Sequence, residues 1–517
     1  MTSAWSRSAA QTTFSIPQAG NYDLTITDAA FPAPLASAPQ VLLLREADSV
    51  TVLMAPGPFT VAAPGDYQLV IIATAGGAAL SGLYGVRVAS GATIAYQSTQ
   101  PVGNMAPATP VTIAAAGQYT LTLSDANFPA TLGSLAVRLT QGDSIIGSLD
   151  AANSVAVNAA TGTAQLFAVA MPAAAEGVGA YRVQLASAQQ TVFADVRTVD
   201  ASPNPETPAI YAFSASTAIT TGIFQLTLED LAFPAAFTSL KAAVTQGGTV
   251  VGTLNTPGSS QFTLQSGPVK VLVAAKPPAA GGNALFGVTL NSAAAGSTNV
   301  IESTQGVGGL FRTNTVSITT AGPYDLVLND LEFPARMATA QLAVTRGTTL
   351  IAQIIGGGTV SRQQLTAGTY VLNFLGQPAA AAQYGTYGLK VAESTPQPTV
   401  TLTATPASIT SGQTTSLQWS STNATTCSAS NGWSGAKSAS GTESVGPLNA
   451  NTTFALSCTG SGGTGTASVT VNVSAPSTNS GGGGGGAFNL GLLAALGVLF
   501  ASQRRFGSAG SAARRYR

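Results

Sequence analysis

The chain reads Ala19-Gly20-Asn21-Tyr22-Asp23-Leu24-Thr25-Ile26-Thr27-Asp28 and then Phe31-Pro32-Ala33, and this phrase occurs four times along its 517 residues. Its later copies contain Tyr119 with Asp125, Phe224 with Asp230, and Tyr324 with Asp330. Apolar and polar residues alternate within the phrase, which is typical of a half-buried β-strand. A phrase that returns at intervals of about 100 residues predicts four copies of one β-rich unit.

Composition supports an all-β fold. The chain has 57 glycines and 28 prolines, which form turns, and it is rich in valine and threonine, which fit a pleated sheet. Only 8% of its residues are charged, against about 25% in an average soluble protein. We therefore expect short strands, many turns, and a polar but nearly uncharged surface.

The charges and the missing residue types exclude several functions. Lys plus Arg and Asp plus Glu number 20 each, so the chain lacks the broad positive field that is typical of nucleic-acid-binding proteins. We therefore expect no nucleic-acid partner. The chain has no histidine, the commonest general base and metal ligand. An enzyme would have to use carboxylates alone, as glycosidases do. Glu229 and Asp230 are adjacent on a strand and would point to opposite faces, so we expect no enzyme activity and no cofactor.

Each unit looks like two related halves, because Gly65-Asp66-Tyr67 echoes the opening phrase of the same unit. Each half is expected to open with a hairpin, such as Val111–Ile113 followed by Tyr119–Leu123. A second hairpin, Val244–Val251, turns at Gly247-Gly248, where glycine supplies the positive φ of a tight turn. Six to eight strands of this kind form a two-sheet sandwich.

Three features of the repeat could be structural or functional. The phenylalanine before proline is expected to plug the sandwich where a strand ends. The repeated Leu83-Tyr84-Gly85-Val86 is expected to be a core strand, with an exposed glycan-binding aromatic ladder as the alternative. The repeated aspartate is expected to accept backbone N–H bonds in an irregular turn, with a calcium ligand as the alternative. The aspartates concerned are Asp28, Asp125, Asp230 and Asp330.

The two cysteines, Cys427 and Cys458, fall in one segment that reads as a single sandwich domain. A disulfide is expected, with two buried thiols in a cytosolic protein as the alternative. Closing a loop of about 31 residues would stabilise the domain by roughly 3 to 4 kcal/mol. Such bonds persist in oxidising compartments, which favours an exported protein.

Residues from Thr399 onward have a different character. Trp419 on a strand, Asn423–Cys427, and Leu456–Cys458 resemble features of the bacterial Ig-like domains of exported proteins. The first cysteine follows the tryptophan strand, so the bridge would join other strands than in antibody domains. The expected fold class is all-β, with tandem Ig-like or jelly-roll-like β-sandwich domains in a row and one C-terminal hydrophobic helix.

The last residues read as a sorting or anchoring segment. Ala487–Ala501 is apolar and is followed by Arg504 and Arg505, a positive flank that favours membrane insertion through 487–502. Fifteen helical residues span only about 22 Å, so a buried core helix is the alternative. The order of glycines, apolar helix and arginines resembles the GlyGly-CTERM sorting signal of Gram-negative bacteria, which implies processing by a rhombosortase-type protease. The glycines are Gly481, Gly482, Gly483, Gly484, Gly485 and Gly486.

These features together predict the domain limits. The expected parts are four sandwich repeats at 1–97, 98–203, 204–302 and 303–396, an Ig-like domain at 397–475, a glycine-rich linker at 476–486, a helix at 487–502 and a basic tail at 503–517. No apolar run of about 7 to 15 residues near Met1 reads as a signal peptide. Because the disulfide and the tail both require export, we expect the natural start to lie upstream.

The sequence thus predicts a non-enzymatic modular protein of the bacterial cell surface, or one secreted after C-terminal processing. It would act as a stalk, adhesin or display scaffold, with a glycan or a host or cell-surface ligand as a possible partner. The alternative is a carbohydrate- or calcium-binding accessory module of a secreted system. A glycosidase that works through two carboxylates is the least favoured hypothesis.

Overall fold

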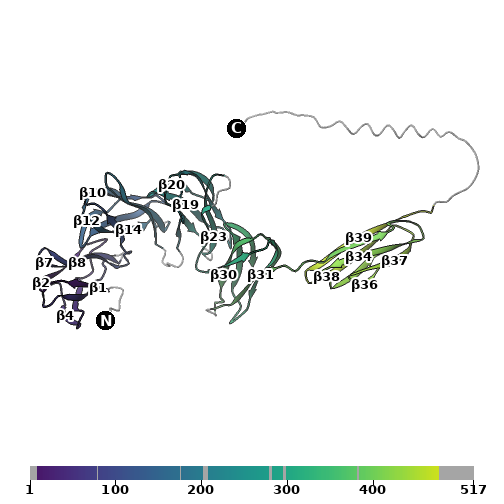
Figure 1. Ribbon diagram of the computed structural model, residues 1–517, viewed down its shortest axis with the longest axis horizontal. Helices are drawn as coiled ribbons and strands as arrows, with labels where there is room; N and C mark the ends of the chain where they lie inside the picture. Colours follow the sequence, from purple (N-terminus) through teal and green to yellow (C-terminus); the bar gives the residue numbers. More distant parts are fainter. Residues whose placement is uncertain are drawn as a thin grey trace, which may run out of the picture. The chain divides into compact units, whose positions relative to one another are not determined.

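The computed structural model describes residues 9–77, 80–174, 176–201, 208–278, 282–294, 299–380 and 384–476. Every helix or strand in these ranges is a β-strand, as the all-β prediction requires (Figure 1). No helix of the length and hydropathy needed to cross a bilayer occurs among them. The predicted C-terminal helix, the glycine run and the arginines lie outside the described residues. The chain divides into two compact units, Met1–Ser394 and Thr395–Arg517.

Sandwich 1 consists of strands β1 to β8. One sheet has the order β1-β6-β3-β4 and the other the order β5-β2-β7-β8. The strands are β1 (Ala9–Ile16), β2 (Gly20–Asp28), β3 (Gln40–Arg45), β4 (Val50–Leu53), β5 (Gly57–Val61), β6 (Gly65–Ile72), β7 (Ser81–Ser90) and β8 (Thr93–Gly103).

Sandwiches 2 and 3 repeat this topology. Sandwich 2 pairs β12-β11-β14-β9 with β13-β10-β15-β16, and sandwich 3 pairs β20-β19-β22-β17 with β21-β18-β23-β24. The strands of sandwich 2 are β9 (Thr109–Ile113), β10 (Gly117–Asp125), β11 (Leu132–Gln141), β12 (Ser144–Leu149), β13 (Asn153–Ala159), β14 (Gly162–Pro172), β15 (Val178–Ala186) and β16 (Thr191–Asp200). Those of sandwich 3 are β17 (Ile210–Ser214), β18 (Gly222–Asp230), β19 (Ser239–Gln246), β20 (Thr249–Leu254), β21 (Gly258–Leu264), β22 (Val269–Lys276), β23 (Ala284–Ser292) and β24 (Asn299–Val307).

Sandwich 4 differs at one edge. Its first sheet, β25-β30-β27-β28, matches the others, but within the described residues its second sheet has only three strands, β29-β26-β31. Its strands are β25 (Phe311–Ile318), β26 (Gly322–Asp330), β27 (Thr339–Arg346), β28 (Thr349–Ile355), β29 (Gly358–Leu365), β30 (Gly368–Gln377) and β31 (Tyr387–Glu393). The predicted count of six to eight strands per unit is therefore confirmed for the described residues. β8 and β24 extend across positions 97 and 302, and the domain limits as residue numbers stay a prediction.

One of the two predicted hairpins is wrong. β9 and β10 do not pair, because β9 bonds to β14 in one sheet while β10 bonds to β13 and β15 in the other. Val111 and Tyr119 both face the same core from opposite sides, so the short connection crosses between the sheets. The second hairpin is confirmed, since β19 pairs with β20 and turns at Gly247 and Gly248, both with positive φ.

The Gly-x-Tyr phrase marks the point where the chain enters a core strand. The Tyr67 hydroxyl donates a hydrogen bond to the Ala63 carbonyl four residues earlier, at 2.9 Å. This pins the incoming loop to the strand, as a tyrosine corner does in other sandwiches. Gly65, two residues before Tyr67, has a φ of 156°, which L-residues rarely adopt. The same bond is made by Tyr22, Tyr119, Tyr324 and Tyr370.

Each sandwich buries its own core between the two sheets. In sandwich 2 the alternating residues of β10, Tyr119, Leu121 and Leu123, lie in one cluster with Tyr181. Tyr84, Tyr181 and Phe286 are all buried, which confirms the core-strand prediction and not the exposed aromatic ladder in these three units. Their counterpart Tyr387 is half-buried and stacks on Phe374, with ring centroids 3.5 Å apart.

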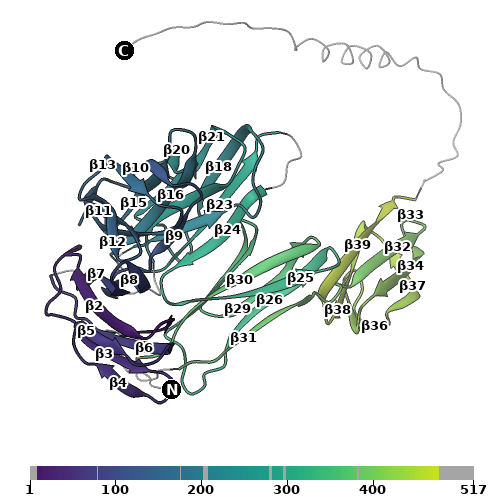
Figure 2. The ribbon, with the colours of Figure 1, turned by 60° about the vertical axis from the view of Figure 1, so that its left-hand side comes forward.

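The C-terminal domain is a second kind of sandwich (Figure 2). A three-stranded sheet, β32-β34-β37, faces a five-stranded sheet, β33-β39-β38-β35-β36. The pair β33 and β39 is parallel, whereas the other pairs in this domain are antiparallel. The strands are β32 (Thr399–Thr405), β33 (Ser408–Thr410), β34 (Gln413–Thr422), β35 (Thr426–Asn431), β36 (Gly435–Lys437), β37 (Ser440–Leu448), β38 (Thr452–Gly460) and β39 (Gly463–Ser474).

Candidate functional site

The repeated aspartate ends a strand and holds the loop that follows it. In sandwich 2 the two carboxylate oxygens of Asp125 accept backbone N–H bonds from Asn127 at 2.8 Å and from Leu132 at 2.7 Å. The first bond closes a turn two residues long, and the second ties down the start of the next strand. Asp28, Asp230 and Asp330 make the same two bonds, to Ala30 and Leu35, to Ala232 and Phe237, and to Glu332 and Met337.

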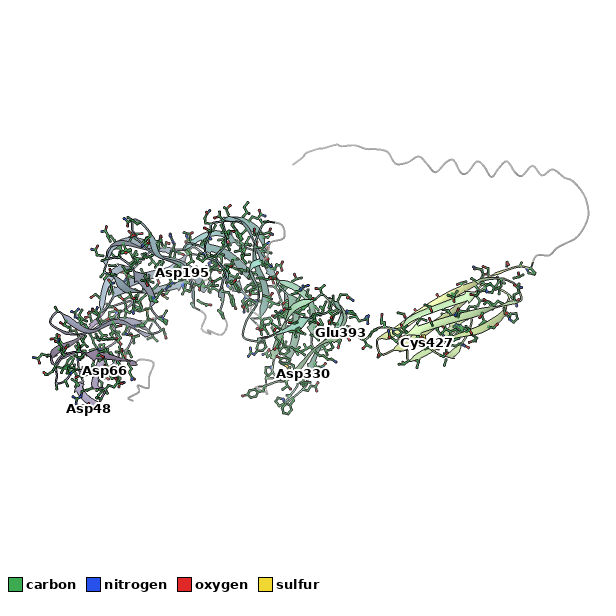
Figure 3. The ribbon with its side chains drawn as sticks, viewed as in Figure 1. Asp48, Asp66, Asp195, Asp330, Glu393 and Cys427 are labelled. Carbon is green, nitrogen blue, oxygen red and sulfur yellow. A yellow bond between two sulfur atoms is a disulfide. The ribbon has the colours of Figure 1, made fainter. Side chains whose placement is uncertain are left out.

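The loop held by each aspartate has an unusual backbone. The residue two positions after the aspartate has a φ near +50° in all four copies, as in Asn127 at 52°. The peptide bond between the phenylalanine and the proline that follow this residue is cis in all four copies. The bond from the carboxylate to the N–H of the positive-φ residue supports a conformation that non-glycine residues seldom adopt. We call these segments the Asp-Phe-Pro loops; Asp330, at the start of the fourth, is labelled in Figure 3.

This geometry bears on the two interpretations of the aspartates. Each carboxylate already serves as a backbone acceptor on both oxygens, which is the turn role that the sequence favours. Among the described residues no three or more Asp, Glu, His or Cys side chains gather closely enough to hold a metal ion. The calcium alternative therefore has no supporting cluster at Asp28, Asp125, Asp230 or Asp330 within these residues.

The phenylalanine of each Asp-Phe-Pro loop packs against the next sandwich. Phe31 of sandwich 1 lies in a buried cluster with Leu83 of its own sandwich and with Phe167 and Val169 of sandwich 2. The Arg138 guanidinium stacks over the Phe31 ring, with its carbon 4.3 Å from the ring centroid. The predicted plug is thus present in the first three copies, where it closes a joint between two sandwiches and not the end of one. For the fourth copy the prediction is wrong, because Phe333 is 70% exposed.

The second and third joints repeat this arrangement. Phe128 of sandwich 2 is buried with Ala243, Leu272 and Ala274 on the outer face of sandwich 3. The Lys241 ammonium of sandwich 3 lies 3.5 Å from the Pro129 carbonyl and 3.3 Å from a Glu176 carboxylate oxygen, so a polar clamp flanks the plug. Phe233 of sandwich 3 packs in the same way with Leu285 and with Ala343, Leu375 and Phe311 of sandwich 4.

A hairpin turn completes two of the joints. In the first joint, Thr99 on β8 donates a hydrogen bond to the Gly142 carbonyl in the β11–β12 turn, at 2.8 Å. A Cβ placed on Gly85 would lie 2.3 Å from the Asp143 carbonyl oxygen of the same turn, so only glycine fits there. In the third joint Thr304 bonds to the Gly347 carbonyl, and a Cβ on Gly287 would lie 2.6 Å from Thr348.

Two clefts of similar size accompany these features. One, of about 320 Å³, lies at the first joint between the Asp28 loop and the β11–β12 turn, with Thr99 and Asp143 in its wall. The other, of about 310 Å³, lies under the Asp330 loop beside Arg336 and Met337. In both clefts the aspartate that starts the loop is committed to backbone N–H bonds, so neither lining offers a free pair of acidic groups for general acid and base catalysis.

The pair Glu229 and Asp230 does not form a catalytic pair. The two residues end β18 at neighbouring positions, opposite Gly287 and Phe286 of β23, and so project to opposite faces of the sheet. Asp230 is the loop-holding aspartate of sandwich 3. A glycosidase needs two carboxyl groups that face one bond of the substrate, which this placement does not supply.

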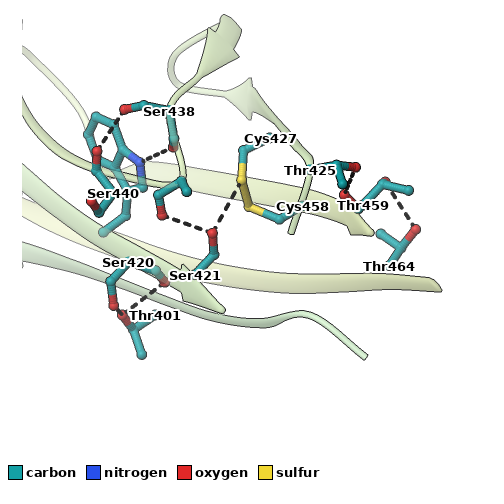
Figure 4. Close-up of a disulfide and its surroundings, with 12 residues drawn as sticks. Thr401, Ser420, Ser421, Thr425, Cys427, Ser438, Ser440, Cys458, Thr459 and Thr464 are labelled. Carbon is teal, nitrogen blue, oxygen red and sulfur yellow. Dashed lines mark hydrogen bonds between the residues drawn. A yellow bond between two sulfur atoms is a disulfide. The ribbon is translucent and has the colours of Figure 1, made fainter. Parts of the chain in front are cut away.

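Cys427 and Cys458 form the predicted disulfide (Figure 4). The cysteines lie directly opposite each other on β35 and β38, two neighbouring strands of the same sheet, with their Cα atoms 4.0 Å apart. The expectation that the bridge differs from the antibody pattern is confirmed, because it does not join the two sheets. The disulfide lies in a core cluster with Trp419 and Trp433, whose rings meet edge to face at 5.2 Å.

Neutral hydroxyl pairs link the strands on the outside of the C-terminal domain. Two of them, Thr401 with Ser420 and Thr459 with Thr464, are visible in Figure 4. Two more join Thr399 to Thr422 and Thr453 to Thr470. Cross-strand pairs of this kind stabilise a sheet by a few tenths to about 1 kcal/mol each. These strands are therefore joined at the surface largely without charge.

Comparisons with known proteins give a limited result. No family model matches the chain, and no curated protein matches it. Among solved structures it is similar to the ectodomain of mouse nectin-like molecule 4, at 11% identity over 50% of this chain and 96% of that one, with a TM-score of 0.16. Salmonella alpha-2-macroglobulin matches at 11% identity over 88% of this chain and 36% of its own, with a TM-score of 0.16. A Dscam structure matches at 10% identity over 71% and 100%, with a TM-score of 0.13. Likeness at this level carries no argument about activity or partners.

Proposed function

We propose that this protein is an exported modular protein of the bacterial surface, or a secreted one, and that it acts without catalysis as a stalk, adhesin or display scaffold. The observation that carries the proposal is that the same kind of joint occurs three times between consecutive sandwiches. Phe31, Phe128 and Phe233 are each buried against the following sandwich, so consecutive modules are packed together and not merely tethered. A chain built to hold modules in fixed succession suits a spacer or a scaffold.

Two further features support export. The Cys427–Cys458 bridge persists where the surroundings are oxidising, as in the periplasm or outside the cell. A surface with few charges and many hydroxyl groups also needs no counterions to stay folded in a medium of changing ionic strength. We propose that Gly481–Gly486, the apolar segment after them and Arg504 with Arg505 form a sorting signal that a rhombosortase-type protease cleaves.

The first experiment locates the protein and its C-terminus. Intact cells that produce the protein are treated with trypsin and with a membrane-impermeant maleimide, and the mature chain is analysed by mass spectrometry. We expect cleavage by external trypsin, no free thiol at Cys427 or Cys458 after denaturation, and a mature C-terminus near the glycine run. Reduced cysteines in a chain that external trypsin does not reach would overturn the export proposal. Intact Arg517 in the surface-exposed protein would refute only the cleavage.

The second experiment asks whether the array binds a ligand or only separates its ends. The folded protein is applied to a glycan array with and without calcium and is titrated with calcium in a calorimeter. A scaffold gives neither spots nor heat, whereas an adhesin for glycans gives a reproducible set of related sugars. Calcium-dependent heat of binding would instead support the accessory-module alternative and contradict the assignment of the loop aspartates to backbone bonds alone.

A further inference from the structure

The second joint differs from the first and third at one strand position. This position holds Gly85 on β7 and Gly287 on β23, but Arg182 on β15. The three residues match in register, because each pairs with the residue just before the loop-holding aspartate of its own sandwich. Arg182 lies on the same face of β15 as Ala180, which belongs to the buried cluster of the second joint, and its Nε is buried. A long cation therefore lies where the other two joints have no side chain.

The hairpin turn that faces this position differs as well. The turns Gly142-Asp143 and Gly347-Thr348 have a positive φ at the first residue only, as in a type II′ turn. The turn Gly247-Gly248 has a positive φ at both residues, 57° and 76°, as in a type I′ turn. Because the backbone angles differ, the two kinds of turn present their central peptide differently to the neighbouring sandwich.

The strand next to this position follows the same division. Thr99 and Thr304 pair with the two glycines and donate hydrogen bonds to the carbonyl of the first turn residue. Val196, which pairs with Arg182, has no hydroxyl and lies in the apolar cluster of the second joint. The first and third joints therefore share one construction, and the second joint has another.

In each construction the strand residue and the turn are matched in space. A Cβ on Gly85 would lie 2.3 Å from the Asp143 carbonyl oxygen, so an arginine does not fit there unless the turn changes. A Cβ on Gly248 would lie 2.8 Å from the Cβ of Ala194 on β16, so the turn of the second joint has no room for a side chain like that of Asp143. Glycine is thus needed on the strand in one kind of joint and on the turn in the other.

Two ion pairs cross the second joint and strengthen the distinction. Lys241 of sandwich 3 lies 3.3 Å from Glu176 of sandwich 2, and Lys270 of sandwich 3 pairs with Asp195 of sandwich 2. Among the described residues no other ion pair crosses a joint. In register with Lys270, sandwiches 2 and 4 have glutamine and valine, and in register with Asp195, sandwiches 1 and 3 have serine. A different order of the sandwiches would therefore leave both charges without a partner.

We propose that the strand position and the turn that faces it form a matching pair that determines which sandwich can follow which. Sandwich 2, with Arg182, accepts the type I′ turn of sandwich 3 and rejects the type II′ turn of sandwich 4 or of another sandwich 2. Sandwiches 1 and 3, with glycine, accept the type II′ turns. Specificity of this kind depends on clashes and unpaired charges as much as on attraction. It keeps similar sandwiches from misassembling, and it depends on the joints alone and not on a ligand or on export.

Thiol labelling of the full-length chain tests the pair from the strand side. Leu83 is fully buried in the first joint, so Leu83→Cys adds a thiol that a maleimide reaches when the joint opens, and the native cysteines are bonded to each other. In this background Gly85→Arg should speed labelling about 10-fold or more, which corresponds to about 1.4 kcal/mol of opening free energy. Adding Asp143→Gly recreates the pair of Arg182 with Gly248 and should slow labelling again. Labelling that stays fast would overturn the proposal, because the arginine would then damage sandwich 1 itself.

The reciprocal change tests the turn side at the second joint. Ala243 is fully buried there, so Ala243→Cys supplies the reporter thiol. Gly248→Asp gives this turn the aspartate of the first joint and should speed labelling about 10-fold or more. The matched control is Asp143→Thr with the Leu83→Cys reporter, which exchanges the turn residues of two joints of the same kind and should leave the labelling rate unchanged. Equal acceleration in both variants, or none in Gly248→Asp, would contradict the proposal.

Discussion

A single carboxylate organises each joint of the repeat array. Asp125 satisfies two backbone N–H groups that the loop would otherwise leave without a partner, and it does so at the point where the chain takes up a positive φ. A hydrogen bond of this kind contributes about 0.5 to 1.5 kcal/mol to stability. The aspartate therefore stabilises a loop shape, and through that shape it aims the phenylalanine.

Substitution of this residue should destabilise its sandwich. For Asp125→Ala we expect a loss of about 1 to 3 kcal/mol in the free energy of unfolding, because both hydrogen bonds to the loop are lost. Limited proteolysis followed by mass spectrometry should show new cleavage between Asp125 and Leu132. Asp150→Ala is the matched control, since the Asp150 side chain is exposed and its ion pair with Arg138 contributes little. Equal resistance of both variants to protease would contradict the role of Asp125.

A second aspartate makes the stability of sandwich 4 depend on pH. The Ser394 hydroxyl, at 2.6 Å, and the Arg362 N–H, at 2.9 Å, hold the pKa of Asp325 below its usual range. A carboxylate with a depressed pKa stabilises the fold above its unfolded pKa of about 3.9 and loses that effect as pH falls through the folded value. Asp325→Asn should therefore unfold earlier than the native protein at pH 6, and the gap should close in acid. A gap that stays constant down to pH 2 in thermal melts would refute this.

At this scale the sequence predicts one property of the aspartates and misses another. The recurrence of aspartate after a strand indicates a turn acceptor, and the structure has that bond in all four copies. The second bond, to an N–H seven residues later, depends on a cis peptide and a positive φ that no local pattern announces. Likewise, an apolar residue such as Phe31 is expected to be buried, but the neighbouring sequence does not show that it is buried against the next sandwich.

At the scale of strands, the alternation of polar and apolar residues predicts where a strand lies and which face is buried, but it does not predict how successive strands pair. The polar-apolar pattern of Gly117–Asp125 predicts the strand and its buried face correctly. It cannot tell a hairpin from a crossing between sheets, because in both cases the two strands turn an apolar face to the same core. The turn chemistry decides this: Gly247-Gly248 supplies two positive φ angles and makes a true hairpin, whereas Ala114–Ala116 does not.

Because a disulfide joins β35 and β38, the stability of the C-terminal domain should depend on redox conditions. Replacing both cysteines with alanine should lower the free energy of unfolding of the C-terminal domain by about 3 to 4 kcal/mol, because the unfolded chain gains the freedom of the closed loop. Tryptophan fluorescence in a urea gradient reports this domain through Trp419 and Trp433. The native protein in reductant should give the same midpoint as the double variant. A variant that unfolds at the oxidised native midpoint would contradict the expectation.

At the scale of the molecule, the buried plug residues Phe31, Phe128 and Phe233 join consecutive sandwiches. Phe128→Ala removes a ring buried between sandwiches 2 and 3, which should cost about 3 to 5 kcal/mol if the space does not collapse. Scanning calorimetry should show these sandwiches unfolding in separate and lower transitions. Phe333→Ala changes the same position of the repeat where the ring is exposed, so in dilute solution its melting should match that of the native protein. Identical thermograms for the two variants would rule out a role for the plug in coupling the modules.

The hydroxyl pairs on the C-terminal domain have a consequence for where the protein can work. Ions in solution weaken the attraction between opposite charges but leave a bond between two hydroxyl groups unchanged. The strands joined by Thr401 with Ser420 and Thr453 with Thr470 should therefore hold equally well in fresh water and at the salinity of the sea. Lys437 and Glu443 form an ion pair in this domain, so its urea midpoint, followed by tryptophan fluorescence, should shift only slightly across that range. A large fall with added sodium chloride would show that charge holds the domain.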